Sequence, residues 1–318
     1  MCPSSSTTTG DTAQRVAFEK LLSDGEQFFQ HMQSRFDPTR DEAQLVHMAT
    51  DGETFGHHHR FGEMALAYLV SRLEGDERLR LTNYGEFPDV ASLVTELTTA
   101  VPEITTIIHN QNGQKSNIAT GEKEQVVFGP GYIEEIALGR RFRIGANTFF
   151  QTNSLQAEKL YQTALDELHL SGDEDVLDLY CGTGAITILL AGTARSVTGV
   201  ELVAASVSAA KENASLNGLV NCRFVEGDVT AFLKGLGDSR LFPVIVIDPP
   251  RAGLHPKALK LILEYGPSKL LYISCNPSTF ARDTRDAIAA GYRLSRVIPV
   301  DMFPHTMHIE VVGLLQRN

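Results

Sequence analysis

The sequence predicts an α/β protein in which a doubly wound parallel sheet follows a smaller α+β domain. From about residue 175 onward, short β-branched runs alternate with helical stretches of about ten to fifteen residues, the pattern of parallel strands joined by crossover helices. Glycine or polar residues follow most of these runs, where such sheets bind their ligands. The composition, 42% hydrophobic and 21% charged, is typical of a folded chain.

Three segments are expected along the chain. Residues 1–60 contain a Ser/Thr-rich tail and a helical segment, residues 61–146 form the smaller α+β domain, and residues 147–318 form the sheet domain. In the smaller domain we predict strands at Ala65–Val70, Ile104–Ile108 and Gln125–Phe128, a helix at Val90–Leu97, and a turn at Gly129-Pro130-Gly131.

The sheet domain begins with a helix within 147–165 that is ended by Ser171-Gly172-Asp173. The strands that we then predict are Asp175–Leu179, Val197–Val200, Cys222–Val225, Pro243–Ile247, Lys269–Ile273, Arg293–Val300 and Glu310–Leu315. The helices predicted between them are Ala185–Ala194, Ser206–Leu216, Pro256–Glu264 and Thr279–Ala290.

Composition and charge exclude several classes of protein. The chain contains no long uncharged apolar stretch and no signal-peptide pattern at its start, so we expect neither a membrane span nor secretion but a cytoplasmic location. Its four cysteines are scattered without a Cys-x-x-Cys pair, which argues against disulfides, zinc or an iron–sulfur cluster. We expect no metal, and we interpret His57-His58-His59 as a solvated loop.

The net charge of −11 comes mostly from residues before 171. A protein that holds a nucleic acid by its overall field should be basic, so any such role depends on local patches. The clearest patch is Arg140-Arg141-Phe142-Arg143.

Three acidic residues mark the ends of the first three predicted strands of the sheet: Asp178, Glu201 and Asp228. The turn with Gly182 and Gly184 after the first strand allows a ligand to approach the backbone, but Thr187 stands where a dinucleotide fingerprint needs its third glycine. The acids therefore suggest S-adenosylmethionine, which has a positive sulfonium, with Glu201 on the ribose and Asp228 on the adenine. Each acid could instead cap the helix that follows it.

The next strands end in residues that could take part in catalysis. Asp248-Pro249-Pro250 resembles the strand end of amino-group methyltransferases, but Arg251 replaces their stacking aromatic residue. Cys275 ends the following strand, where a helix N-terminus and Arg251 or Arg282 could activate it as a nucleophile. Glu310 begins the last apolar strand, where partial burial would raise its pKa and suit it to act as a base.

Four ordered motifs, within about residues 60–318, resemble the RNA uracil-5-methyltransferases, which form 5-methyluridine in tRNA or ribosomal RNA. They are Phe149-Phe150-Gln151-Thr152-Asn153, Asp248-Pro249-Pro250-Arg251-Ala252-Gly253-Leu254, Tyr272-Ile273-Ser274-Cys275-Asn276-Pro277 and the segment from Asp301 to Glu310. The resemblance implies a Rossmann-like methyltransferase sheet, with residues 61–146 as the RNA-recognition domain. It also implies that RNA is the partner and S-adenosylmethionine the cofactor.

The resemblance further implies roles for individual residues. Cys275 would add to C6 of uracil, C5 would then take the methyl group, and Glu310 would remove the C5 proton. Gln151, Tyr180, Gly182, Glu201, Asp228 and Asp248 would line the cofactor site, whereas Asp248, Arg251 and Phe150 would contact the flipped base. An aromatic pair such as Phe149-Phe150 can equally serve packing.

The chain also departs from the family. Many members have an N-terminal oligonucleotide-binding barrel and a four-cysteine iron–sulfur site, and neither is expected here. Two other functions compete with the proposed one. An RNA cytosine-5 methyltransferase would have a second cysteine where Arg251 follows Pro250, and a non-catalytic RNA-binding or folding protein could keep this fold. The sequence leaves the oligomeric state open, with a monomer as the working expectation.

Overall fold

The computed structural model describes residues 15–16, 21–39, 46, 62–73, 76, 78–79, 90–111, 123–237, 239, 241–304, 306 and 308–317. The chain divides into two compact units, Met1–His109 and Asn110–Asn318. His57, His58 and His59, which we interpreted as a solvated loop, lie outside the described residues. Cys2, His305 and Met307 also lie outside them.

The described part of the first unit is helical. It contains the 3-10 helix η1 (Leu21–Ser23) and the helices α2 (Gly25–Gln33), α3 (Gly62–Leu73) and α4 (Val90–Ala100). α4 was predicted, and η1 and α2 lie within the helical segment that was predicted for residues 1–60. Asp24 caps α2, because its Oδ1 accepts hydrogen bonds from the backbone N–H groups of Glu26 and Gln27.

The strand predicted at Ala65–Val70 is wrong, because these residues belong to α3. Ala65 and Leu69 are four residues apart and are both buried, so a helix places them on one face. They pack in a small core with Val16, Leu21, Leu22, Phe28 and Phe29. The uninterrupted apolar run had no period by which a helix could be distinguished from a strand.

Two small two-stranded sheets precede the main sheet in the chain. β1 (Ile107–Gln111) pairs with β2 (Lys123–Phe128), and β3 (Ile133–Ala137) forms a hairpin with β4 (Arg140–Ile144). The hairpin turn consists of Leu138 and Gly139, both with positive φ, as a type I′ turn requires. Two asparagines hold β4 against α7 (Ala204–Leu216). Asn213, within α7, accepts a hydrogen bond at its Oδ1 from Arg143 N at 2.8 Å. Asn217, the C-cap of α7, accepts one at its Oδ1 from Arg141 N at 3.0 Å.

The second unit is built on a seven-stranded sheet in the order β10-β11-β9-β8-β5-β6-β7. Its strands are β5 (Asp175–Leu179), β6 (Ser196–Glu201), β7 (Cys222–Glu226), β8 (Val244–Ile247), β9 (Lys269–Ser274), β10 (Tyr292–Val300) and β11 (Glu310–Arg317). The first five are parallel to one another, which confirms the predicted doubly wound α/β fold. β11 is antiparallel to both of its neighbours, β9 and β10. No crossover helix separates β10 from β11 in the chain, as an antiparallel pair allows.

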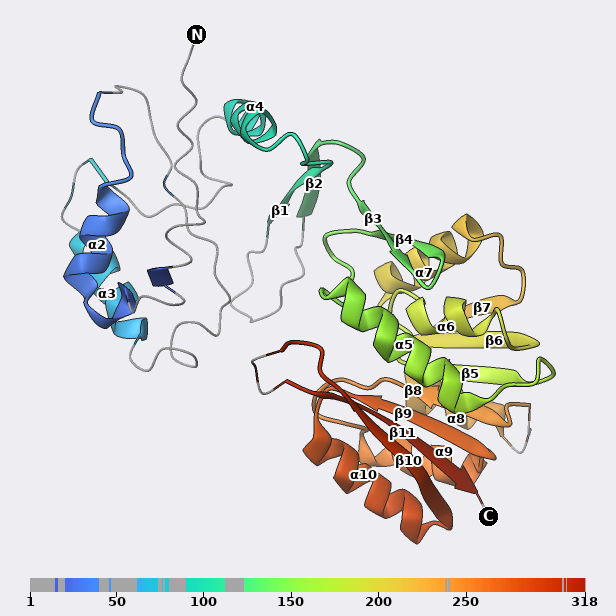
Figure 1. The fold of residues 1–318 in the computed structure, drawn as a ribbon. Coiled ribbons are helices and arrows are strands. Elements are labelled where there is room, and N and C mark those ends of the chain that lie inside the picture. The colour runs from blue at the N-terminus through green and yellow to red at the C-terminus, as the bar shows by residue number, and fades with distance from the viewer. Residues whose placement is uncertain are drawn as a thin grey trace. The chain divides into compact units, whose positions relative to one another are not determined.

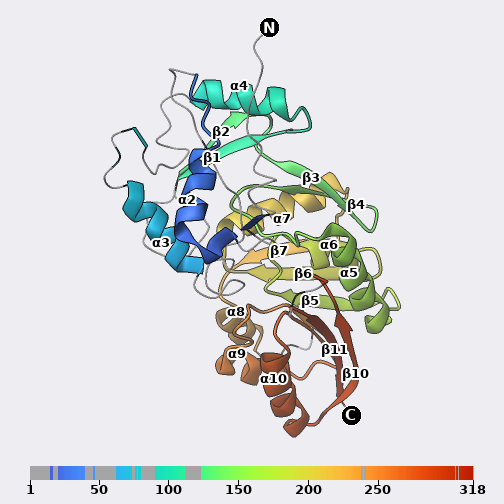
Figure 2. The ribbon, with the colours of Figure 1, turned by 60° about the vertical axis from the view of Figure 1, so that its left-hand side comes forward.

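Helices cover both faces of this sheet (Figures 1 and 2). They are α5 (Ser154–Leu168), α6 (Ala185–Leu190) and α7 on one face, and α8 (Val229–Leu236), α9 (Pro256–Tyr265) and α10 (Pro277–Ala289) on the other. Successive strand residues alternate between the two cores, so that Val176 contributes to the first and Leu177 to the second. Burial on both faces explains why the central strands β8 and β9 are nearly continuous apolar runs. Among the described residues, no helix is long and apolar enough to cross a membrane.

Candidate active site

The predicted site residues of the second unit follow the carboxyl ends of neighbouring parallel strands. Tyr180 and Gly182 follow β5, Glu201 ends β6, and Asp228 follows β7. Asp248 follows β8 and Cys275 follows β9. These strands are adjacent in the sheet, so their ends form one edge, where ligands bind in sheets of this kind.

Cys275 and Glu310 come from adjacent antiparallel strands. The ladder between β9 and β11 pairs Ser274 with Val311. Cys275 is the next residue after Ser274 and Glu310 is the residue before Val311, so the two occupy the next opposed positions in the register. Both are half-buried. Residues far apart in the sequence are therefore brought together at the end of this ladder.

Two carboxyl groups at this end of the sheet hold their protons unusually strongly. Burial raises the pKa of Glu310 to about 7. Burial also raises the pKa of Asp248 well above its ordinary value, with further contributions from Glu310 and Asp178. Glu310 therefore has the property that the sequence predicted for it, an affinity for protons suited to a base at neutral pH.

The surroundings of the Cys275 thiol favour its neutral form on balance. Burial raises the pKa of this thiol, as do the nearby Glu310 and Asp248, whereas Arg251 lowers it. Arg282, the other predicted activator, instead makes an ion pair with Asp283 and hydrogen bonds to the carbonyls of Ala252 and Leu254. Burial and two acidic neighbours therefore outweigh one arginine at this thiol.

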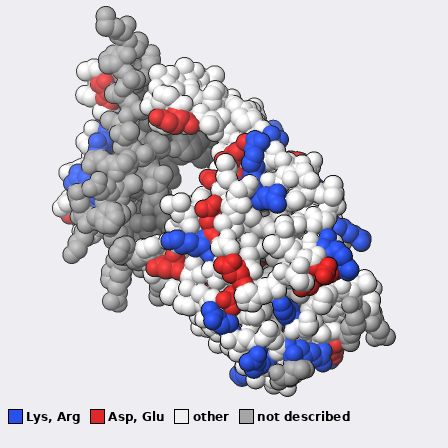
Figure 3. All heavy atoms as spheres, turned by 45° about the vertical axis from the view of Figure 1, so that its right-hand side comes forward, with Lys and Arg blue, Asp and Glu red and all other residues white. Residues whose placement is uncertain are grey.

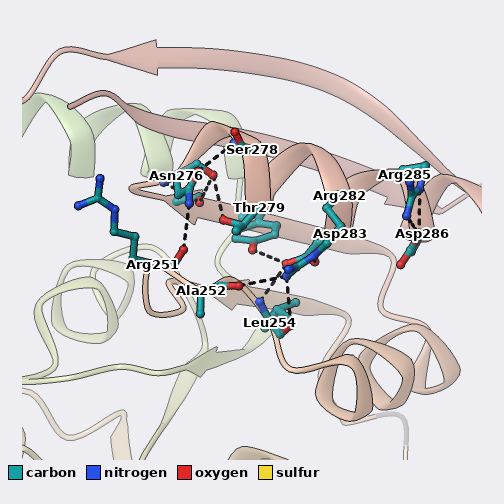
Figure 4. A network of polar contacts seen from close by, with 12 residues as sticks. Arg251, Ala252, Leu254, Asn276, Ser278, Thr279, Arg282, Asp283, Arg285 and Asp286 are labelled. Carbon is teal, nitrogen blue, oxygen red and sulfur yellow. Dashed lines mark hydrogen bonds and ion pairs between the residues drawn. The ribbon is translucent and has the colours of Figure 1, made fainter. Parts of the chain in front are cut away.

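Arg251 lies in the loop between β8 and α9. Its carbonyl oxygen accepts a hydrogen bond from Asn276 Nδ2 at 3.2 Å, which joins this loop to the residue after Cys275. Its side chain is exposed and extends away from that loop, and its guanidinium makes no hydrogen bond or ion pair within the described part of the chain (Figure 4). Arg251 is thus a cation near the thiol that remains available to a substrate.

The glycine turn after β5 is conformationally unusual. Tyr180 has a φ of 65°, which is rare for a residue other than glycine, and Gly182 has a φ of 52°. A Cβ added to Gly182 would meet nothing within 4 Å, so this backbone is open to a ligand. The Gly182 N–H donates to Glu201 Oε2 at 3.1 Å, and the Val203 N–H donates to Glu201 Oε1 at 2.9 Å. The turn and the end of β6 therefore position one another.

Asp178 provides a test of whether a cationic cofactor fits beside this turn. Thr187, at the position of the missing third glycine, donates its hydroxyl to Asp178 Oδ2 at 2.6 Å. The other oxygen, Oδ1, is buried and has no hydrogen-bond partner. Burial raises the pKa of this carboxyl to about 7. An unsatisfied acidic oxygen beside an open glycine turn fits a ligand with positive charge or hydrogen-bond donors, as S-adenosylmethionine has.

Asp228 performs the simpler role that was considered for it. Its Oδ1 accepts a hydrogen bond from Ala231 N at 2.9 Å, so it caps α8. The side chain is exposed, and its second oxygen makes no hydrogen bond to the described residues. Capping therefore leaves one carboxylate oxygen for a ligand.

The segment Phe149–Asn153 lies between the two halves of the site. The Thr183 hydroxyl donates to the carbonyl of Phe149 at 3.2 Å, and Asn153 Nδ2 donates to the carbonyl of Met302 at 2.8 Å. Gln151 is therefore held between the glycine turn and the connection that leads to Glu310.

Phe150 occupies the core rather than an open surface. It is 9% exposed, and its ring centroid lies 5.4 Å from that of Phe142. Phe149, in contrast, is 72% exposed. This arrangement favours packing, the alternative that the sequence left open for Phe150, over stacking on a base.

Sequence reasoning missed several residues that surround the site. Tyr161 is buried on α5, and burial together with Asp248 and Glu310 raises the pKa of its phenol. Asp283 is buried on α10 and binds the loop that follows β8. An acidic residue on the otherwise apolar face of a predicted helix was the available signal for Asp283, whereas Tyr161 resembled an ordinary core residue.

Two of the three arginines in the basic segment of β4 pair with one glutamate. Glu134 makes ion pairs with Arg141 at 2.7 Å and with Arg143 at 3.1 Å, and the Arg143 guanidinium also lies over the Tyr132 ring. Basic and acidic side chains are interspersed over the face seen in Figure 3. Among the described residues, no group of three or more His, Cys, Asp or Glu side chains could hold a metal ion.

The sheet order, the glycine turn and the acidic strand ends define the class of this protein as the Rossmann-like S-adenosylmethionine-dependent methyltransferases. The sequence model of the tRNA (uracil-5-)-methyltransferase family matches residues 92–318, so the chain belongs to that family, as the motifs predicted.

Individual relatives agree with this assignment. An uncharacterized RNA methyltransferase of Caldanaerobacter subterraneus subsp. tengcongensis is 45% identical over 67% of this chain and 47% of its own length. Another, from Chlorobaculum tepidum, is 44% identical over 71% of this chain and 48% of its own length. The chain thus spans about half the length of the curated relatives it matches.

A solved structure is also similar. Pyrococcus abyssi tRNA (uracil-54, C5)-methyltransferase, in complex with S-adenosyl-L-homocysteine, superposes with a TM-score of 0.58 at 33% identity. The similarity covers 69% of this chain and 52% of that one.

Proposed function

We propose that this protein transfers a methyl group from S-adenosylmethionine to C5 of a uridine in tRNA or ribosomal RNA, through a covalent bond between Cys275 and C6. One observation carries the proposal: the strand register places Cys275 and Glu310 at opposed positions, with Asp248 and Arg251 close by in space. A nucleophile, a base and a base-recognition group are then available at one sheet edge.

The residue types suit the chemistry of uracil. C5 is a weak nucleophile until a thiolate adds to C6, which forms the S–C6 bond and moves the electrons of the C5–C6 double bond toward C5 and O4. S-adenosylmethionine would supply the methyl group that C5 accepts, and its S–CH3 bond would break to leave neutral S-adenosylhomocysteine. Glu310 then takes the C5 proton, the double bond re-forms, and the S–C6 bond breaks to release the Cys275 thiolate.

The acidic neighbours of Cys275 fit this sequence of events. The raised pKa of Asp248 favours its neutral acid form, which can donate a hydrogen bond to the polar edge of uracil. The raised pKa of the thiol implies that Arg251 and the bound reactants are needed to favour the thiolate. Activation then coincides with occupation of the site.

The predicted cofactor residues would contact different parts of S-adenosylmethionine. Gly182, Tyr180 and Glu201 would hold the nucleoside portion, where the open turn and the end of β6 meet. Asp228 would use its remaining oxygen, and Gln151 would close the site from the segment before α5. The unpaired oxygen of Asp178 would face the positive end of the molecule.

RNA would enter as an unpaired or flipped uridine, because C6 is out of reach of a side chain within a helix stack. Arg251 is an accessible cation for the RNA backbone or the base edge. Arginine at this position also argues against the cytosine-5 alternative, which would need a cysteine after Pro250.

The test uses labelled S-adenosylmethionine and unmodified tRNA or ribosomal RNA. We expect label in 5-methyluridine with the unchanged protein and none with Cys275→Ala. Glu310→Gln should lower turnover by about 10²- to 10⁴-fold, the usual effect of losing a general base, while a covalent protein–RNA complex accumulates.

Glu212→Gln is the matched control, because Glu212 is an exposed carboxylate on α7. It should leave methyl transfer unchanged. Normal turnover of Glu310→Gln would refute the assignment of the base. A protein that binds RNA but incorporates no label with any of these RNAs would support the non-catalytic alternative.

A further inference from the structure

The loop after β8 is fixed to α10 by one buried carboxylate. Asp283 is 2% exposed, and its Oδ2 accepts hydrogen bonds from Leu254 N at 2.9 Å and from the Tyr272 hydroxyl at 2.8 Å. Its Oδ1 accepts from Arg282 Nε at 2.8 Å. One side chain therefore joins the loop, the strand β9 and the helix α10.

Arg282 extends this attachment to the loop backbone (Figure 4). Its guanidinium donates to the carbonyls of Ala252 and Leu254 at 3.1 and 3.4 Å. Gly253, between them, has a φ of 78°, and a Cβ there would lie 2.6 Å from the Arg282 guanidinium and 2.9 Å from Asp283 Oδ2. The backbone of the loop thus lies directly against the Arg282–Asp283 pair.

Arg251 depends on this attachment for its position. Its own side chain has no hydrogen bond or ion pair within the described ranges, so its backbone sets the region that its charge can reach. That backbone is held at Arg251 O by Asn276 and, immediately after it, by Arg282 and Asp283.

The charged groups around Cys275 make the placement of Arg251 consequential. Glu310 approaches from β11 and Asp248 from the end of β8, and both disfavour the thiolate. Among the described charged groups that influence the pKa of this thiol, Arg251 is the cation, and it lowers that pKa. The thiol also precedes the N-terminus of α10, which begins at Pro277.

We propose that Asp283 is a positioning residue that, through Arg282 and the loop 248–254, holds Arg251 beside Cys275 and so promotes ionisation of the thiol. The proposal rests on the proposed function only for the role of the thiolate. Its test needs neither RNA nor cofactor, so the two can fail separately.

The experiment measures the rate at which iodoacetamide alkylates Cys275 in the full chain between about pH 6 and 10, with peptide mass spectrometry to distinguish it from the other cysteines. Arg251→Gln should raise the midpoint of the pH profile. Asp283→Asn should shift it in the same direction, with alkylation below the midpoint slowed about three- to tenfold, the equivalent of half to one pH unit.

The double variant Asp283→Asn/Arg251→Gln is decisive. If Asp283 acts through Arg251, the double variant should have the same midpoint as Arg251→Gln alone. Shifts that add in the double variant, or an unshifted Asp283→Asn, would overturn the proposal.

Two controls separate positioning from general destabilisation. Asp286→Asn alters the neighbouring Arg285–Asp286 pair, which is exposed one turn later on the same helix, and should leave the midpoint unchanged. Tyr272→Phe removes one buried partner of Asp283 but leaves both loop attachments, so it should lower stability without moving the midpoint. An equal shift in either control would also overturn the proposal.

If Asp283→Asn does not fold, Arg282→Gln replaces it in the same series. The Arg282 side chain is 46% exposed, so the fold should tolerate this change. The change removes the hydrogen bonds to the carbonyls of Ala252 and Leu254. The same upward shift, again absent on the Arg251→Gln background, is expected. An unchanged Arg282→Gln profile would contradict the proposal, whereas methyl transfer and adduct formation would still decide the proposed function.

Discussion

At the scale of single residues, the chemistry of the site depends on which of its acidic groups are protonated. Burial raises the pKa of Glu310, Asp248 and Cys275, and the charge of Glu310 adds to the increase for Asp248 and Cys275. A protonated Asp248 limits the repulsion that a thiolate would otherwise meet. Burial leaves Glu310 ready to accept a proton near neutral pH.

The pH dependence of turnover follows from Glu310. A base must be deprotonated to act, and burial raises its pKa to about 7, so turnover should rise with pH through about 7. Below that value it should fall about tenfold per pH unit. Methyl-transfer rates at saturating RNA between about pH 5.5 and 8.5 provide the measurement. A rate that does not change between pH 5.5 and 7.5 would contradict the role of Glu310.

At the scale of elements, strands buried on both faces were the easiest to predict. β5 was predicted with its observed bounds, Asp175–Leu179, and β8 within one residue of its observed bounds. Both are short, mainly apolar segments that are followed by turn residues. α8 was missed although Val229, Phe232, Leu233 and Leu236 have helical spacing, because eight residues provide little periodic signal.

The site was only partly predictable from the sequence. Strand-end rules identified Cys275 and Glu310 as candidates, but the opposition of the two residues depends on the register of β9 and β11, which no local pattern encodes. The raised pKa of the Cys275 thiol depends on the same tertiary packing. The role of Arg282 in holding Asp283 and the loop was likewise invisible in the sequence.

Close packing between β6 and the glycine turn gives a prediction for an element. A Cβ on Gly199 would lie 2.8 Å from Cys181 Sγ and 2.9 Å from Thr187 Oγ1, so Gly199→Ala should destabilise the protein by about 1–3 kcal/mol through overpacking. It should also weaken binding of S-adenosylmethionine, because Thr187 holds Asp178. Urea unfolding and calorimetric titration provide the measurements.

Gly235→Ala is the matched control. Gly235 lies in α8 with nothing within 4 Å of an added Cβ, so alanine should stabilise the helix by about 0.5–1 kcal/mol. Gly199→Ala at or above the stability of the unchanged protein would refute the packing argument.

At the scale of the whole molecule, charge and stability are linked through buried acids. The net charge is −11, and much of the basic surface on β4 is paired with Glu134. We therefore expect a weak general electrostatic attraction for RNA, and the proposed recognition would depend on individual exposed cations such as Arg251.

Asp178 should make the stability of the fold depend on pH. Its pKa is about 7 in the folded protein against 3.8 ordinarily, so its stabilising effect is complete below about pH 4 and is lost as pH rises through 7. Between pH 5.5 and 8 this loss is on the order of 2 kcal/mol. Asp178→Asn, which cannot ionise, should lack that part of the decline in urea unfolding. Equal declines in the two proteins would contradict the assignment.

The central claim is that the sulfur of Cys275 bonds to C6 of a uridine whose C5 is being methylated. The most direct measurement is mass spectrometry of the protein after incubation with S-adenosylmethionine and an RNA that contains 5-fluorouridine, whose C5 has no proton for Glu310 to remove. We predict a stable protein–RNA complex whose methylated fluorouridine is attached to the peptide that contains Cys275. Attachment at another residue, or no complex with an RNA that the protein methylates in its uridine form, would contradict the claim.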